Sequence, residues 1–155
     1  MSSSTQIDLR LLLEVTCDVG PVTSIGATPL GEVRLVSLLG GTFEGPELRG
    51  KLLPGGADWQ QVRSDGTLEI RAKYLLETDQ GELIQVQSEG VRAASPEVLA
   101  RLDRGELPEP HEYYFRTALR FTTAAPRLLR LNNALGVSYG RRAPRQVMLS
   151  FFEVL

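Results

Sequence analysis

The chain has 155 residues and a formal net charge of −2, from 17 basic and 19 acidic side chains. Hydrophobic residues make up 42% and charged residues 23%, which is ordinary for a globular protein, and the length predicts one domain over residues 1–155. The near-neutral charge gives no electrostatic reason to expect nucleic acid or a membrane surface as a partner. No signal-peptide pattern and no stretch able to span a bilayer is found, so we expect a cytoplasmic protein.

Cys17 and His111 are the only residues of their types. A single thiol cannot form an internal disulfide, and one histidine with one cysteine gives no metal-ligand pattern, so we expect no metal. We also expect no cofactor, because Pro46 stands where the phosphate-loop spacing of Gly40–Pro46 would need lysine. Cys17 should pack as a small hydrophobe in a strand. His111 should lie in a solvated loop, with a proton shuttle at a barrel mouth as the alternative.

Apolar and polar residues alternate through the first half of the chain, which predicts β-strands. Residues 18–32 hold three glycines and two prolines and predict a loop, with a short strand at most inside it. Asp65-Gly66 predicts a tight turn between two strands. The expected strands are Ile7–Cys17, Val33–Leu39 (ended by Gly40-Gly41), Leu48–Leu53, Trp59–Arg63, Thr67–Glu77 and Glu82–Gln87.

The second half begins with the one expected helix, Ser95–Arg104, where Ser95 can cap and proline occupies the first helical position. A strand at Tyr113–Thr122, a short helical turn at Pro126–Asn133, and strands at Leu135–Tyr139 and Gln146–Val154 follow. The last strand is apolar on both faces. This pattern predicts burial on both sides and is compatible with a homo-oligomer such as a dimer.

Eight or more short strands at meander spacing, with one short helix, predict an all-β fold. We expect an antiparallel closed β-barrel of about eight to ten strands, since closure removes exposed strand edges. A barrel of eight strands is wide enough inside to hold one small ligand.

The segment Gly40–Gln60 packs six glycines and two prolines around a few polar and aromatic side chains. Flexible positions of this kind can hold side chains at the mouth of a pocket. Asp58-Trp59-Gln60 places an acid, an indole and an amide in sequence, and burial beside Trp59 would raise the pKa of Asp58 enough for acid–base chemistry. In the structural alternative, Asp58 caps the turn at Gly55-Gly56 and Trp59 fills the core.

Arg116 lies mid-strand on the same face as Tyr114. If this face points into the barrel, Arg116 is a buried cation that needs an anionic partner such as Glu44, Asp58 or a ligand. The alternative is an ion pair on the exterior. Arg49 and Arg92 are weaker candidates for a buried cation of the same kind. The basic run over residues 141–145 is interpreted as a solvated turn.

Several motifs resemble the DUF3237 domain family, also called UPF0311. Two glycine-rich segments and a Tyr-Phe-Arg-Thr element carry most of the resemblance, which covers about Val33 to Val154. The matching residues are Gly40-Gly41-Thr42-Phe43-Glu44-Gly45-Pro46, Leu48-Arg49-Gly50, Pro54-Gly55-Gly56-Ala57-Asp58-Trp59-Gln60, Tyr74, Thr78-Asp79, Gly90 with Arg92, Tyr114-Phe115-Arg116-Thr117, Phe121 and Leu131-Asn132.

The resemblance implies an antiparallel barrel of lipocalin-like (calycin-like) shape with a central cavity. Some relatives look like cofactor-free enzymes of natural-product pathways that shape ring closure or isomerisation. Four positions depart from the family pattern: Arg71 replaces an aspartate, Gln85 an aromatic residue, Thr122 a glutamate and Arg130 a tryptophan. These departures suggest an altered pocket or altered chemistry.

The leading hypothesis is a cofactor-independent cyclase or isomerase of secondary metabolism that acts on a small molecule in the barrel cavity. Asp58 would be the acid or base, Arg116 would stabilise developing negative charge, and Glu44 is a further catalytic candidate as one of the possible partners of Arg116. The alternatives are a non-catalytic carrier or sensor, and a structural domain with a filled core. Expected substrate contacts are Trp59, Gln60, Tyr74, Tyr114, Phe121, Asn132 and Arg49.

Overall fold

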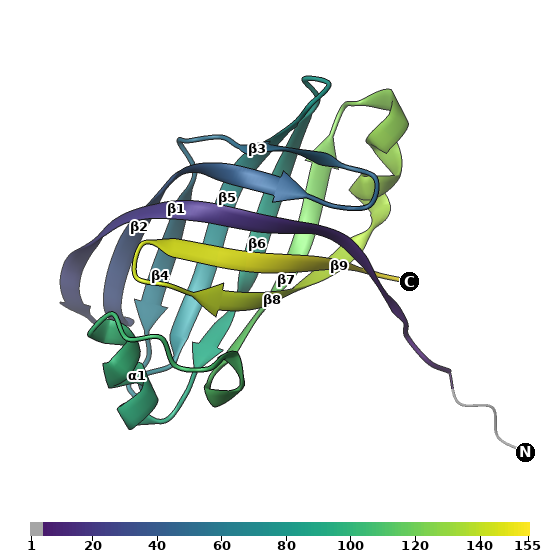
Figure 1. The fold of residues 1–155 in the computed structure, drawn as a ribbon. Helices are drawn as coiled ribbons and strands as arrows, with labels where there is room; N and C mark the ends of the chain where they lie inside the picture. Colours follow the sequence, from purple (N-terminus) through teal and green to yellow (C-terminus); the bar gives the residue numbers. More distant parts are fainter. Residues whose placement is uncertain (1–4) are drawn as a thin grey trace, which may run out of the picture.

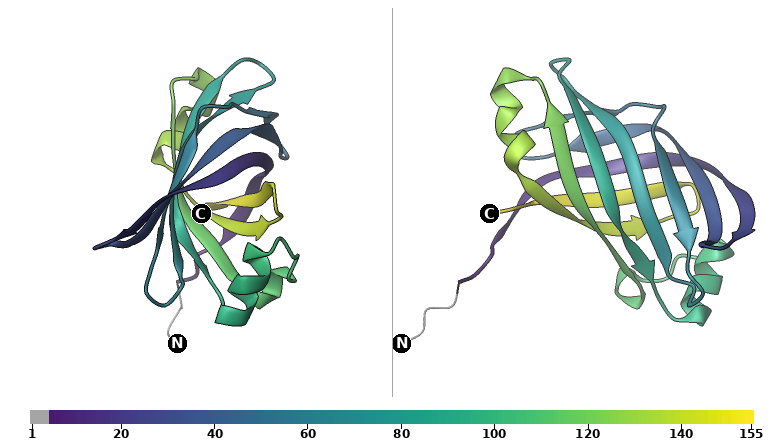
Figure 2. Two further views of the ribbon diagram at one scale, coloured as in Figure 1. Left: turned by 90° about the vertical axis from the view of Figure 1, so that its left-hand side faces the viewer. Right: turned by 180° about the vertical axis from the view of Figure 1, so that it is seen from behind.

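A computed structural model describes residues 5–155 as nine antiparallel strands, one α-helix and two 3-10 segments (Figures 1 and 2). The first four residues, which belong to the predicted domain 1–155, lie outside the described part. The strands are β1 Leu9–Thr28, β2 Gly31–Glu44, β3 Arg49–Leu52, β4 Ala57–Val62, β5 Leu68–Thr78, β6 Leu83–Ala93, β7 Tyr114–Thr123, β8 Leu135–Arg142 and β9 Gln146–Val154. The helical elements are α1 Pro96–Asp103, η1 Pro110–Glu112 and η2 Pro126–Asn133.

The sheet closes on itself, because β1 pairs with β9 along one edge and with β2 along the other. From β9 the order runs through β8, β7, β6 and β5, and both β3 and β4 bridge β5 to β2. The predicted all-β antiparallel architecture is confirmed, and the ring of pairings makes it barrel-like. We call this ring the barrel. The single expected helix corresponds to α1, and the expected helical turn corresponds to η2.

The prediction of a loop over residues 18–32 is wrong. β1 continues to Thr28 and stays paired with β2, with irregular register between Asp18 and Val22 and again between Ser24 and Gly26. Bulges of this kind bend a strand and increase its twist without ending it. The glycines and prolines therefore mark where the long strand curves around the barrel.

β2 also continues past Gly40-Gly41, which were expected to end it. Gly41 faces Cys17 on β1, and a Cβ at Gly41 would lie 2.0 Å from the carbonyl oxygen of Thr16. Only glycine allows the two backbones to approach this closely. Gly41 therefore permits the close contact between β1 and β2 in the ring.

Short helical elements lie at the two ends of the barrel (Figure 1). At one end, Ser95 caps α1 by accepting a hydrogen bond from the Val98 amide at 3.2 Å, and Val98 and Leu102 pack on a buried cluster that includes Phe115. At the other end, Leu128 of η2 is buried in the main core. These two ends are called the α1 end and the η2 end.

The main hydrophobic core fills the η2 end. The rings of Phe121 and Phe151 lie 6.2 Å apart, centroid to centroid, and Leu131 is fully buried with them. On β9 the inward residues Phe151 and Glu153 are buried, whereas the outward Phe152 is half-buried. Among residues 5–155 no helix is long and apolar enough to cross a membrane.

Candidate functional site

A cavity of about 410 Å³ lies inside the barrel, between the main core and α1. Its size suits one small ligand. Residues 102–105 and Pro144 lie at the α1 end of the lining. Most of the wall is apolar and comes from inward-facing strand residues, among them Val36, Leu38, Ile70, Phe115 and Leu149.

Asp58 points into this cavity from β4, between Val36 of β2 and Ala72 of β5. Its Oδ2 accepts a hydrogen bond from Gln60 Nε2 at 2.8 Å, and its Oδ1 accepts one from the Arg71 backbone amide at 3.1 Å. Burial raises the pKa of Asp58, although these hydrogen bonds and the nearby arginines oppose the rise. The carboxyl group is thus held rigidly and is a stronger base than an exposed aspartate.

Tyr74 and Cys17 line the same cavity. The Tyr74 side chain is buried, and its hydroxyl has no hydrogen-bond partner among residues 5–155. Burial, followed by the charges of Cys17 and Asp58, raises the pKa of Tyr74, so its phenol stays protonated and can donate a hydrogen bond. Burial raises the pKa of the Cys17 thiol to about 11, so this residue behaves as the predicted apolar strand residue.

Three arginines from different strands also line the cavity: Arg34 of β2, Arg92 of β6 and Arg142 of β8. Arg34 Nη2 donates to Gln60 Oε1 at 3.0 Å, which links this guanidinium through Gln60 to Asp58. Arg92 is 9% exposed, and its Nε is buried without a partner in the described part of the chain. The site therefore combines two carboxylates, Asp58 and Asp103, and one phenol with several cations.

The structure brings together three of the residues that the sequence singled out. Asp58, Gln60 and Tyr74 all line the cavity. Trp59, between Asp58 and Gln60, points outward and is 55% exposed. Neither the expectation that it shapes the cavity nor the alternative that it fills the core agrees with this position. Alternation along β4 explains the outcome, because neighbouring residues in a strand face opposite sides of the sheet.

Arg116 lies on the outside of the barrel, which corrects the expectation that it faces the interior. Its guanidinium carbon lies 3.8 Å from the ring centroid of Tyr139 and 5.2 Å from that of Tyr114, and Nη1 donates to the Phe115 carbonyl at 2.9 Å. Tyr114 is likewise 55% exposed. The inward face of β7 carries Phe115 and Thr117 instead. Arg116 is thus an exterior cation stabilised by aromatic faces.

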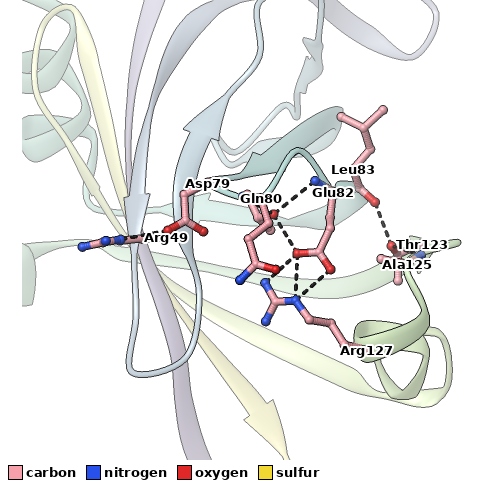
Figure 3. A network of polar contacts seen from close by, with 9 residues as sticks. Arg49, Asp79, Gln80, Glu82, Leu83, Thr123, Ala125 and Arg127 are labelled. Carbon is pink, nitrogen blue, oxygen red and sulfur yellow. Dashed lines mark hydrogen bonds and ion pairs between the residues drawn. The ribbon is translucent and has the colours of Figure 1, made fainter.

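Glu44 and Arg49 lie at the surface, away from the cavity, beside an open groove. Arg49 Nε forms an ion pair with Asp79 at 3.1 Å (Figure 3). In the same view, Glu82 binds Arg127 of η2 and fixes the β5–β6 turn. Local ion pairs account for this region, and neither Glu44 nor Arg49 can contact a molecule in the cavity.

Phe121 and Asn132 also lie apart from the cavity. Phe121 is packed in the main core against Phe151. The Asn132 side chain accepts from the Thr123 amide at 2.9 Å and donates to the Thr123 carbonyl at 2.9 Å. Asn132 therefore fastens η2 to the end of β7, and its position indicates a structural contribution.

Two of the cavity arginines were missed by the sequence argument, and Arg92 was given little weight. Arg142 was interpreted as part of a solvated turn, but β8 extends to this residue and its side chain reaches the cavity. Arg34 is in phase with the inward residues Val36 and Leu38, and Arg92 with Ser88. The sequence feature that could have identified these arginines is their spacing of two or four residues from apolar or small inward-facing residues of the same strand.

The four departures from the family pattern all lie outside the cavity lining, so they do not alter the pocket directly. Gln85 and Thr122 face each other across β6 and β7. The Arg71 side chain is exposed beside Trp59, while its backbone amide supports Asp58. Arg130 forms an ion pair with Glu153 of β9, so at this position an ionic contact ties η2 to the barrel.

Among residues 5–155, no group of three histidine, cysteine, aspartate or glutamate side chains is arranged to hold a metal ion. His111 is exposed in η1 and does not line the cavity. The side chains that line the cavity can transfer a proton through Asp58, donate a hydrogen bond from Tyr74, and stabilise negative charge through arginine.

Comparison with known proteins finds a matching family, similar curated relatives and solved structures of the same fold. The family model "Protein of unknown function (DUF3237)" matches residues 7–154. A UPF0311 protein of Rhodopseudomonas palustris is 36% identical over 149 residues, which is 96% of this chain and 97% of the relative. A beta-barrel like protein from Acinetobacter baumannii AYE is 36% identical, with a TM-score of 0.86 and full coverage of both chains. An enzyme from Penicillium herquei shares the fold at 21% identity, with a TM-score of 0.75 over 100% of this chain and 99% of that one.

Proposed function

This chain belongs to the DUF3237 family, and we propose that it is a cofactor-independent enzyme that rearranges a small molecule in the barrel cavity, as a cyclase or an isomerase. A fold and a family of unknown function do not imply an activity, so the proposal depends on the site. One observation carries it. The Asp58 carboxylate is held by two hydrogen bonds inside a largely apolar cavity, and burial raises its pKa.

In the proposed reaction, Asp58 acts as a general base. It removes a proton from a carbon next to a carbonyl group, or from a hydroxyl group that then attacks an activated double bond. The negative charge that develops on the carbonyl oxygen is stabilised by guanidinium groups and by the Tyr74 hydroxyl. The same proton returns to a different atom, so neither isomerisation nor ring closure needs an oxidant or a reductant.

The fold is compatible with catalysis. A protein of the same fold from Penicillium herquei is described as an enzyme. At 21% identity this likeness concerns the fold alone. It supports the proposal only by showing that a barrel of this shape can belong to an enzyme.

A non-catalytic carrier or sensor is the second candidate. The position of Arg116 favours it, because the acid–cation pair expected from Asp58 and Arg116 is not formed inside the cavity. Arg34, linked to Asp58 through Gln60, supplies a cation at the site in its place. The two candidates differ in one measurable respect: a carrier binds its ligand but does not move a proton.

Proton removal can be measured before the product is known. The protein is incubated in deuterium oxide with a panel of enolisable aryl ketones, and deuterium incorporation is followed by mass spectrometry. Asp58→Asn should lower the exchange rate by about 100-fold or more, the range typical for a general base. The matched control is Glu89→Gln, an exposed β6 residue outside the cavity, which should change the rate less than about 2-fold.

Each result of this experiment separates the candidates. An Asp58→Asn variant that exchanges protons as fast as the wild type would show that Asp58 is not the base. Binding of panel members without exchange in the wild type would favour the carrier.

A further inference from the structure

We infer that the arginine side of the cavity is an anion-binding subsite, in which Arg34, Arg92 and Arg142 take the carboxylate of a small acidic ligand with an apolar body. The inference depends on the proposed function only in treating this ligand as the substrate. The binding site itself is argued from the charges and contacts of the three arginines.

Arg92 is the strongest sign of the site. Its side chain enters the cavity from β6, is 91% buried, and has a buried Nε without a hydrogen-bond partner among residues 5–155. Arg34 Nε is buried and unpartnered in the same way. A buried guanidinium costs free energy unless it is paired, because the protein removes its hydration. Arg92 is such a group, whereas the half-buried Arg34 is partly satisfied by Gln60, and the position of Arg92 in the cavity wall indicates a place made for a partner.

The protein does not supply that partner itself. Within residues 5–155, no carboxylate oxygen lies within 4.0 Å of a guanidinium nitrogen of Arg34, Arg92 or Arg142. Asp103 lines the same cavity and acts on Arg92 by its charge, but only from beyond ion-pair distance. Asp58 is already engaged by Gln60 and the Arg71 amide. The three arginines thus form a positively charged group inside a chain whose net charge is −2.

Their mutual repulsion supports the same conclusion. Burial, followed by the positive charges of Arg142 and Arg34, lowers the pKa of Arg92 to about 10. Burial and Arg34 also lower the pKa of Arg142. A negatively charged ligand group between them would relieve both effects, since each guanidinium would gain an opposite charge at short range.

The surrounding wall defines the ligand class. Guanidinium groups match the planar, two-oxygen geometry of a carboxylate. Leu68, Phe115, Val147 and Leu149 line the same cavity and suit an apolar or aromatic body. The volume of about 410 Å³ limits that body to a small molecule. A carboxylate fixed at the arginines would present the body of the ligand to Asp58 and Tyr74.

Isothermal titration calorimetry with two matched probes, 2-naphthoate and 2-naphthamide, tests the inference on the intact protein. These probes share shape and apolar area and differ in charge. The wild type should bind the carboxylate at least tenfold more tightly, the difference expected for a charge-assisted pair. Arg92→Met and, separately, Arg142→Met should each remove about tenfold of the carboxylate affinity and leave the amide affinity within about twofold.

Arg120→Met is the matched control, because Arg120 is exposed on the outer face of β7 and does not line the cavity. It should leave both affinities unchanged. Thermal melts of each variant establish that it is folded, and two independent arginine variants keep the test decisive if one fails to fold. Equal affinities for the two probes in the wild type, or no detectable binding of naphthoate in the millimolar range, would overturn the inference.

This failure is distinguishable from failure of the proposed function. If naphthoate has no advantage while Asp58→Asn still abolishes proton exchange, the anion subsite is wrong and the proposed base stands. If the carboxylate preference holds while Asp58→Asn exchanges normally, the subsite stands and the catalytic proposal is wrong.

Discussion

At the scale of single residues, the site depends on which way alternate side chains point. The sequence was sufficient to single out Asp58, Gln60 and Tyr74, because they lie near glycine-rich turns or within an alternating strand. It was insufficient for Arg116, since the same alternation is compatible with either face until the register is known. Arg34 was missed because a lone charge in a strand is usually exposed, and Arg142 because its basic run is typical of a solvated turn.

The pH dependence of turnover follows from the direction of the Asp58 shift. Burial raises the pKa of Asp58 above its ordinary value of 3.8, and a general base is active when deprotonated. We therefore expect kcat to fall as the pH decreases through the raised pKa, with a midpoint above 3.8. The rate of deuterium exchange, measured across pH with a carboxylate-bearing ketone, checks this. A rate that rises on acidification through that range would assign Asp58 the role of an acid.

Arg92 should reduce the stability of the ligand-free protein. Replacing a buried, unpaired cation with an apolar side chain of similar length removes a desolvation cost, so Arg92→Met should raise the unfolding free energy by about 1 kcal/mol. The melting temperature should then increase by roughly 3 °C. Differential scanning calorimetry of Arg92→Met and of the exposed control Arg120→Met measures the difference. A melting temperature below that of the wild type would show that Arg92 already has a stabilising partner.

At the scale of elements, the strands were predictable where alternation is clean, as in β5 and β7. The stretch from Asp18 to Thr28 was not, because glycines and prolines that indicate a loop here accommodate bulges in a long strand. What keeps that stretch in the sheet is its pairing with β2, a contact that no local pattern reveals. The α1 helix was predicted well, since its capping serine and first-turn proline are local signals.

The contact between η2 and β9 offers a test at this scale. Glu153 is buried and binds Arg10 and Arg130. Burial opposes ionisation, but the hydrogen bonds from both arginines outweigh it and lower the pKa of Glu153. Glu153→Gln should therefore reduce the unfolding free energy by about 2 kcal/mol at neutral pH.

The sign of the pH effect follows from the lowered pKa. The contribution of Glu153 is present above its unfolded-state pKa and is lost as the pH falls through the lower folded-state value. Urea unfolding of wild type, Glu153→Gln and the exposed control Glu89→Gln, at neutral and acidic pH, measures this. A constant difference between wild type and Glu153→Gln at all pH values would contradict the ionic explanation.

At the scale of the whole molecule, closure of the barrel depends on the close approach of β1 and β2. Strand count and the family resemblance predicted a barrel. Only the strand pairing in the structure shows that β1 and β2 meet at Gly41. Gly41→Ala would place a Cβ 2.0 Å from the Thr16 carbonyl oxygen and force the two strands apart. We expect a loss of about 3 kcal/mol in unfolding free energy.

Gly20→Ala is the matched control for this prediction, because it lies on β1 and its added Cβ would meet Ser37 at an ordinary 3.6 Å. Thermal melts should show a decrease of roughly 6–12 °C for Gly41→Ala and little change for Gly20→Ala. Equal melting temperatures for the two variants would mean that β1 and β2 can move apart at Gly41 without loss of stability, and that their close approach does not control closure of the barrel.

The central claim is that the cavity holds a small acidic molecule, with its carboxylate at the arginines and its body facing Asp58. A crystal structure of the protein with 2-naphthoate tests it most directly. We predict carboxylate oxygens at about 2.7–3.1 Å from guanidinium nitrogens of Arg92 and Arg142, with the rings against Phe115 and directed toward Asp58 and Tyr74. Naphthoate bound outside the barrel, or inside it with the carboxylate directed away from both arginines, would contradict the claim.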